Sequence, residues 1–139
     1  MIVAVDFDGI LCEDKFPLIG EPNYRVISLV RQLIDNGAEV ILWTSRCEQE
    51  LQAAVDWCDD YGLRFCAIND NAPSNKEQFG GKYKNLPRKV YADVYIDDHN
   101  SEFEYRHSTQ GYKLAKKNLV NVIERLIEKQ KRKAGNSNG

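Results

Sequence analysis

The chain has 139 residues, of which 42% are hydrophobic and 29% charged, and its formal net charge is -2. This balance is typical of a single folded domain and excludes wholesale disorder. It also excludes a strongly basic field that would attract nucleic acid, and the apolar runs are too short to span a bilayer. We therefore expect no membrane and no clear nucleic-acid partner.

The cysteines and the amino terminus indicate a reducing compartment. Cys12, Cys47, Cys58 and Cys66 include no C-x-x-C pair, so neither a zinc site nor a disulfide framework is expected. The first residues carry no basic segment followed by a long apolar stretch, which a secretory signal requires. The sequence thus predicts a cytoplasmic protein whose cysteines stay reduced and mostly occupy the core.

The first half of the chain alternates apolar runs with helical patterns. Residues 2–6 are a short β-branched run, typical of a strand buried on both faces. Pro22 could open a helix whose apolar stripe runs from Val26 to Ile34, and Asn36-Gly37 predicts the end of that helix. Residues 38–44 form a second apolar run.

A second helix, with its apolar stripe from Leu51 to Cys58, is expected to end at Gly62 before a third strand over residues 64–68. Residues 69–89 show no period and predict a long loop, and residues 90–96 predict a fourth strand. The last helix carries an apolar stripe from Leu119 to Ile127.

This alternation predicts one α/β domain over residues 1–130, with an open parallel sheet, helices on both faces, and a flexible tail at 131–139. Ligands of such sheets bind beyond the carboxyl ends of the strands. Polar residues stand at the ends of three of the predicted strands or just beyond them: Asp6 and Asp8, then Thr44, Ser45 and Arg46, then Asp97 and Asp98. Carboxylates gathered in this way repel one another unless a cation neutralises them, and Mg²⁺ prefers such oxygen ligands.

The same residues resemble the motifs of the haloacid dehalogenase-like superfamily. DFDGI at 6–10 resembles its D-x-D motif, Thr44 its second motif, and IDD at 96–98 its acidic fourth motif. Lys89 is the candidate for the lysine of the third motif, with Lys76, Lys82 and Lys84 as alternatives. The resemblance implies a Rossmann-like core, and the short segments 9–22 and 69–89 leave no room for a substantial cap domain.

The resemblance also implies an activity: the protein would be a Mg²⁺-dependent phosphohydrolase that acts through an aspartyl-phosphate intermediate. Asp6 would attack phosphorus, and Asp8 would act as general acid and then as general base. If Asp8 is not the general acid and base, His99 is the next candidate for this role.

The remaining roles concern the metal and the substrate phosphate. Mg²⁺ would be held by Asp6, the backbone carbonyl of Asp8, and Asp97, while Asp98 would orient water or the lysine without touching the metal. Thr44 and Lys89 would stabilise the transferred phosphoryl group. Ser45 is a candidate substrate contact, and Arg46 follows it, either binding a substrate phosphate or forming a surface ion pair. An open site without a cap could take a large phosphorylated substrate, or be covered by a second subunit in a homo-oligomer.

Two alternatives stay open. A receiver-like phosphoryl-signalling module shares the parallel sheet, acidic pocket, threonine and lysine, but its phosphoacceptor ends the third strand, which here ends in Ile68-Asn69-Asp70. A non-catalytic relative that binds phosphate ligands or partners is the second alternative, although every catalytic residue type is present.

Overall fold

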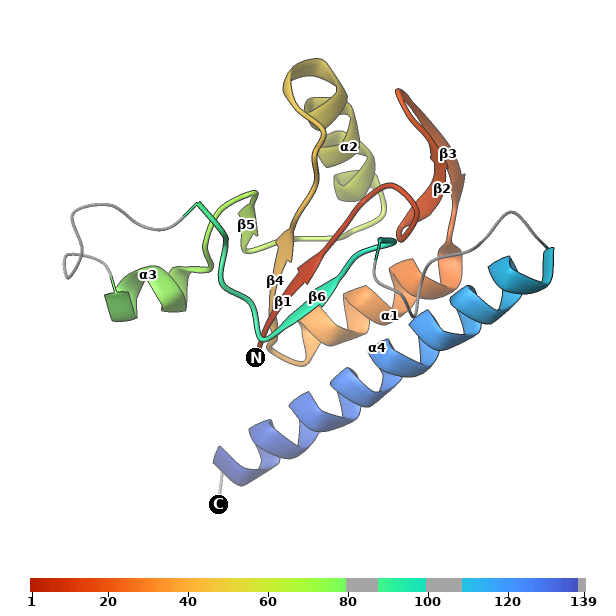
Figure 1. Cartoon of the computed structure of the whole chain (residues 1–139). Coiled ribbons are helices and arrows are strands. Elements are labelled where there is room, and N and C mark those ends of the chain that lie inside the picture. Colours follow the sequence, from red (N-terminus) through yellow and green to blue (C-terminus); the bar gives the residue numbers. More distant parts are fainter. Residues whose placement is uncertain (80–87, 100–108, 138–139) are drawn as a thin grey trace.

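The computed structural model describes residues 1–79, 88–99 and 109–137. Its centre is a four-stranded sheet in the order β5-β4-β1-β6, in which every pairing is parallel (Figure 1). The strands are β1 (Ile2–Val5), β4 (Glu39–Leu42), β5 (Ala67–Ile68) and β6 (Val94–Ile96). The α/β fold class with an open parallel sheet, predicted from the sequence, is confirmed.

The sheet is buried on both faces, as its uninterrupted apolar strands predict. Val3 and Val5 belong to the larger core cluster, whereas Ile2 and Ala4, which point to the opposite face, belong to a second and smaller cluster. Both clusters exclude water from β1, so this strand is a rigid base for the residues that follow it.

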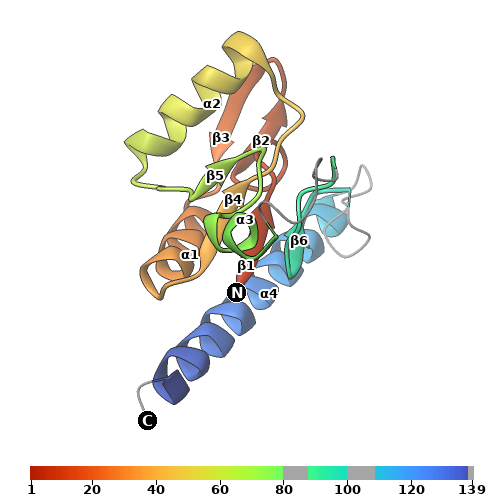
Figure 2. The same cartoon turned by 90° about the vertical axis from the view of Figure 1, so that its left-hand side faces the viewer.

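Helices cover the two faces unequally (Figure 2). Side chains of α1 (Tyr24–Asp35), α2 (Glu48–Asp60) and α4 (Thr109–Ser137) join the larger cluster, and α1 and α4 pack against each other. The smaller cluster draws Ala72, Val90 and Ala92 from the segments that flank α3 (Pro73–Phe79) and precede β6.

Glycines end the first two helices where the sequence predicts. Gly37 has a φ of 93° just after α1, and Gly62 a φ of 72° just after α2, a conformation that side-chain-bearing residues rarely adopt. At the carboxyl end of the chain, α4 continues to Ser137, so residues 131–137 are helical where the sequence suggested a flexible tail.

Four local expectations were wrong. Residues 12–22 form an antiparallel hairpin of β2 (Cys12–Lys15) and β3 (Leu18–Pro22), so Pro22 ends a strand instead of opening α1. The predicted long loop contains the helix α3. The third predicted strand, expected over 64–68, is limited to Ala67–Ile68. The fourth, expected over 90–96, is limited to Val94–Ile96. The hairpin strands mix charged with apolar residues, and Cys12 is their one fully buried residue, so they carry no hydrophobic period that would reveal them.

The four cysteines are free, as expected, and burial raises the pKa of Cys12 and of Cys58 to about 12. Both thiols therefore stay protonated within the core. None of the helices in the described residues has the combination of length and apolar character that crossing a bilayer needs.

Candidate functional site

Three carboxylates meet at the carboxyl edge of the sheet. Asp6 follows β1 directly, and Asp97 and Asp98 follow β6, the neighbouring parallel strand. The backbone N–H of Asp6 donates to the carbonyl of Ile96 at 2.8 Å, which continues the pairing of the two strands to the site. As a result, one carboxylate oxygen from each aspartate lies within 4.8 Å of the others.

The charges of this acidic cluster disturb one another. Burial, followed by the charges of Asp97 and Asp98, raises the pKa of Asp6 to about 8, although the N–H of Phe7 donates to its Oδ1 at 2.7 Å and acts in the opposite direction. Burial also raises the pKa of Asp98, with Asp97 adding to the effect. A cluster of carboxylate oxygens with this electrostatic cost is a donor set suited to a hard divalent cation.

Gly9 brings the loop after β1 against this cluster. Its φ is 84°, and a Cβ at this position would collide with the carboxylate of Asp98. Glycine is therefore needed both for the turn and for the close approach. The sequence predicted Asp98 outside the metal ligands, whereas the structure brings its carboxylate into the same cluster as Asp6 and Asp97.

Thr44 reaches the same edge from β4 and is held by a residue that the sequence analysis missed. The backbone N–H of Thr44 donates to Oδ1 of Asn69 at 2.8 Å. Asn69 follows β5 with a φ of 51°, and the N–H of Arg46 donates to Thr44 Oγ1 at 3.1 Å. A polar residue directly after a predicted strand is the signal that could have pointed to Asn69.

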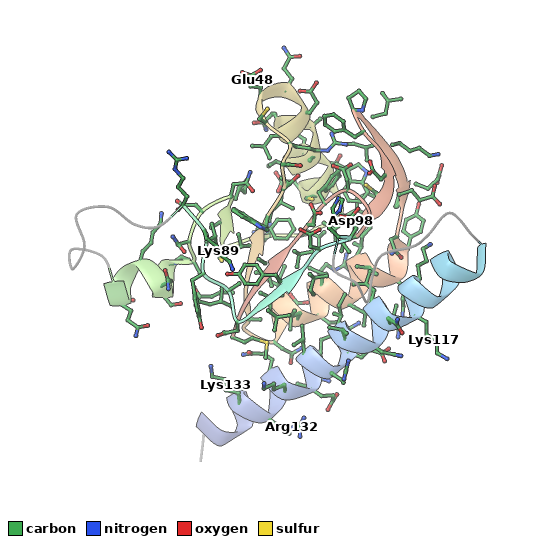
Figure 3. All side chains as sticks on the ribbon, viewed as in Figure 1. Glu48, Lys89, Asp98, Lys117, Arg132 and Lys133 are labelled. Atoms are coloured by element: carbon green, nitrogen blue, oxygen red, sulfur yellow. The ribbon has the colours of Figure 1, made fainter. Side chains whose placement is uncertain are left out.

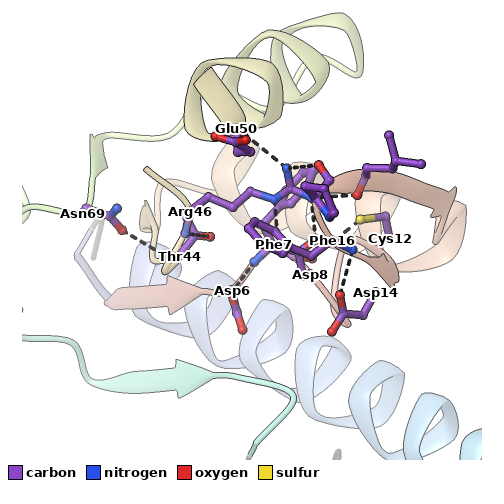
Figure 4. Close-up of polar contacts among 12 residues, drawn as sticks. Asp6, Phe7, Asp8, Cys12, Asp14, Phe16, Thr44, Arg46, Glu50 and Asn69 are labelled. Atoms are coloured by element: carbon purple, nitrogen blue, oxygen red, sulfur yellow. Dashed lines mark hydrogen bonds and ion pairs between the residues drawn. The ribbon is translucent and has the colours of Figure 1, made fainter. Parts of the chain in front are cut away.

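Arg46 is buried beside Asp8, with only 2% of its surface exposed (Figure 4). Its Nε and one terminal nitrogen donate to the two carboxylate oxygens of Asp8, both at 2.8 Å. The remaining donors reach the carbonyls of Pro17, Leu18 and Glu50 at 2.9–3.3 Å. Arg46 thus ties the loop after β1, the β2–β3 hairpin and the start of α2 together.

This arrangement corrects the expected role of Arg46. Each of its guanidinium nitrogens donates to a protein group, and both terminal nitrogens donate twice, so no donor remains for a substrate phosphate. Both alternatives considered for Arg46 were therefore wrong, because the ion pair with Asp8 is buried and not at the surface. Hydrogen bonds to Asp8 are the largest cause that raises the pKa of Arg46.

Lys89, the first candidate for the catalytic lysine, does not line the acidic pocket. Lys89 is exposed, and its Nζ lies 5.1 Å from the ring centroid of Tyr95, whose side chain packs with the smaller core cluster (Figure 3). Lys76 pairs instead with Asp70. Lys82 and Lys84 lie outside the described residues. Among the described residues, none of the candidate lysines lines the acidic pocket.

The acidic cluster lines a pocket of about 550 Å³. The pocket is lined by residues that follow three of the sheet strands and by the β2–β3 hairpin: Asp6, Asp8, Asp14, Phe16, Trp43, Thr44, Ser45, Asp97, Asp98 and His99. The structure therefore brings together every predicted site residue except Lys89 and Arg46. It adds Asp14, Phe16 and Trp43, which have no motif that the sequence could reveal.

His99 lies at the rim of this pocket with an exposed side chain. Its backbone N–H donates to Asp97 Oδ1 at 2.9 Å, and its Nε2 lies 3.9 Å from Asp98 Oδ1. The N–H contact orients the Asp97 carboxylate within the cluster.

Together, the fold and this site define an α/β protein with an open parallel sheet and an acidic pocket beyond the strand ends. The chain is similar to the solved structure of a conserved protein from Bacteroides thetaiotaomicron, with 35% sequence identity and a TM-score of 0.63 over 73% of this chain and 78% of that chain. It belongs to the family of that conserved protein. No family model and no curated protein matches the chain.

Proposed function

We propose that this protein is a Mg²⁺-dependent phosphohydrolase of the haloacid dehalogenase-like superfamily, acting on a phosphate monoester through a phosphorylated Asp6. One observation carries the proposal. Carboxylates from β1 and β6 converge within 4.8 Å, and they share one pocket with Thr44 from the end of β4. These are the residues that resemble the D-x-D, threonine and acidic motifs.

The donor set fits Mg²⁺. Asp6, Asp97 and Asp98 offer three carboxylate oxygens close together, and burial, followed by the charges of Asp97 and Asp98, raises the pKa of Asp6 to about 8. When bound, Mg²⁺ supplies positive charge that stabilises the ionised carboxylates and the developing phosphoryl charge.

In the first half of the reaction, a carboxylate oxygen of Asp6 forms a bond to phosphorus while the bond from phosphorus to the leaving oxygen breaks. The leaving oxygen takes a proton from Asp8, and the product alcohol departs. Thr44 donates a hydrogen bond to a phosphoryl oxygen, a role supported by the two contacts that fix its backbone N–H and its Oγ1.

In the second half, a water oxygen attacks phosphorus, and Asp8 accepts the proton that the water loses. The bond between phosphorus and Asp6 breaks, which regenerates the carboxylate and releases inorganic phosphate. Both Asp8 oxygens accept hydrogen bonds from Arg46 in this structure, so one of them must leave the guanidinium before Asp8 can hold a proton. Arg46 is therefore a positioning residue for Asp8.

The described residues give less support to a receiver-like module. In such a module the phosphoacceptor follows the third strand of the parallel sheet, which is β5 here, and this chain has Asn69 at that position. The next residue, Asp70, is exposed and paired with Lys76, away from the acidic pocket. A carboxylate two positions after the nucleophile also favours hydrolysis over a long-lived phosphoryl group.

An aryl phosphate assay with and without Mg²⁺ tests the proposal. Wild type should release phosphate only with the metal, and Asp6→Asn should abolish turnover because an amide cannot serve as the nucleophile. Asp70→Asn is the matched control, since Asp70 is an exposed aspartate outside the pocket, and this variant should keep wild-type turnover. Turnover by a pure sample of Asp6→Asn would refute the assignment of Asp6 as the nucleophile. Failure of wild type on a broad panel of phosphate monoesters would favour the non-catalytic alternative.

A further inference from the structure

We propose that the ring of Phe16, near the tip of the β2–β3 hairpin, is a stacking platform that selects phosphate monoesters bearing a planar ring, either a nucleobase or an aryl group. This inference rests on the proposed function for the phosphate and adds the class of substrate. It concerns the wall of the pocket and not the carboxylate cluster at its floor.

The first support is the exposure of Phe16. The residue is 59% exposed, and it also lines the pocket that contains the carboxylate cluster. An aromatic ring left in water beside a polar pocket is an apolar surface that a ligand can cover. The fold gains little from Phe16 in this position, because the ring lies outside both core clusters.

The second support is that the fold holds this exposed ring in place. The backbone N–H of Phe16 donates to Asp14 Oδ1 at 3.2 Å, and the guanidinium carbon of Arg46 lies 5.2 Å from the ring centroid. Arg46 is itself buried and lies 5.0 Å from the ring of Phe7, so the guanidinium is a fixed neighbour (Figure 4). A ring that is already positioned loses little freedom when a ligand stacks on it.

The third support is the composition and size of the pocket. Trp43, which ends the run before Thr44, adds a second aromatic side chain to the lining from a different element. The volume of about 550 Å³ lies in the range of small-molecule sites and exceeds what a phosphate group alone would fill. A pocket with a carboxylate cluster at its floor and aromatic side chains in its walls suits a ligand that has a phosphate at one end and a flat apolar ring at the other.

Leu18 provides a matched control on the same hairpin. Its side chain is 73% exposed but does not line the pocket, and only its backbone carbonyl contacts Arg46. A change of the Leu18 side chain therefore alters the exposed apolar surface of the hairpin without altering the proposed platform.

The experiment compares pairs of phosphate monoesters that differ by the ring. Adenosine 5′-monophosphate is compared with ribose 5-phosphate, and phenyl phosphate with an alkyl phosphate, by calorimetric binding and by kcat/KM with Mg²⁺. Wild type should prefer the ring-bearing member of at least one pair by about 10-fold or more, as expected for stacking on an aromatic side chain. The pair that shows the preference identifies the ring as nucleobase or aryl.

Variants assign the preference to Phe16. Phe16→Leu should remove most of it while leaving ribose 5-phosphate unaffected, which also reports that the variant is folded, and Phe16→Tyr should retain it. Leu18→Ala should behave as wild type. Equal affinity within both pairs, no binding of any of the four compounds, or equal effects of Phe16→Leu and Leu18→Ala would overturn the inference. Ring-selective binding without hydrolysis would refute the proposed function alone, and hydrolysis without ring preference would refute this inference alone.

Discussion

Replacing Asp6 by asparagine should stabilise the metal-free protein, although the same change should abolish catalysis. Asparagine is nearly isosteric with aspartate, and its carbonyl oxygen can still accept the N–H of Phe7. The substitution removes a carboxyl whose ionisation is favourable in the unfolded chain but disfavoured in the buried cluster that Asp6 forms with Asp97 and Asp98. The variant therefore avoids this cost of folding and keeps the local hydrogen bond.

The size of the effect follows from the pKa of Asp6. Its ordinary value of 3.8 applies to the unfolded chain, and burial with the neighbouring charges raises it to about 8 in the folded protein. A raised carboxyl pKa favours the folded state fully below the unfolded value and loses that contribution as pH rises toward the folded value. A solution at pH 7 lies roughly 3 pH units above the ordinary pKa of 3.8, and each unit corresponds to about 1.4 kcal/mol. The free energy of unfolding of the wild type at pH 7 is therefore lower by up to about 4 kcal/mol than at a pH below 3.8.

Denaturant unfolding of both proteins in the absence of divalent metal, between pH 4 and pH 9, measures this difference. The stability advantage of Asp6→Asn should be small near pH 4 and grow as pH rises, and added Mg²⁺ should stabilise wild type more than the variant. An equal or lower stability of Asp6→Asn at pH 7 would refute the reasoning.

Asp93→Asn is the control of opposite sign. The N–H of Ile2 donates to the Asp93 carboxylate at 2.8 Å and is the largest cause that lowers its pKa. The stability that Asp93 contributes is present above its ordinary pKa and is lost as pH falls. This variant should therefore be less stable than wild type at pH 7, with the difference shrinking in acid.

Three further results are expected. Arg46→Ala should destabilise the fold by about 3–5 kcal/mol in urea unfolding, because it leaves the Asp8 carboxylate without its buried partner, and a smaller loss than about 1 kcal/mol would contradict this. Gly9→Ala should weaken Mg²⁺ binding measured by calorimetry, since a Cβ there displaces Asp98, and unchanged affinity would count against the metal site. Asp8→Asn should slow turnover by ~10²–10⁴-fold and accumulate phosphorylated Asp6 after a burst on aryl phosphates, as seen by rapid-quench mass spectrometry; a wild-type rate would exclude Asp8 as the acid–base.

The sheet, and the edge at which the site forms, could be predicted from local patterns in the sequence. Short apolar runs that end at a charged or polar residue predict strands buried on both faces, and the glycines after α1 and α2 predict where those helices end. Because parallel strands end at one edge, the positions of Asp6, Thr44 and Asp97 along the chain were enough to predict that they share a pocket. These inferences depend on local patterns and on one topological rule.

Other features depend on contacts between segments that are distant in the sequence. The hairpin strands lack a hydrophobic period, so their pairing depends on contacts such as those from Arg46 to the carbonyls of Pro17 and Leu18. The ion pair of Arg46 with Asp8 joins residues far apart in the chain, and no spacing rule distinguishes it from an arginine that faces a substrate. The direction of a long, flexible side chain is set by the partners that the fold brings to it. The same reason explains why Lys89, at a plausible distance in sequence from Asp97, lies instead over the ring of Tyr95.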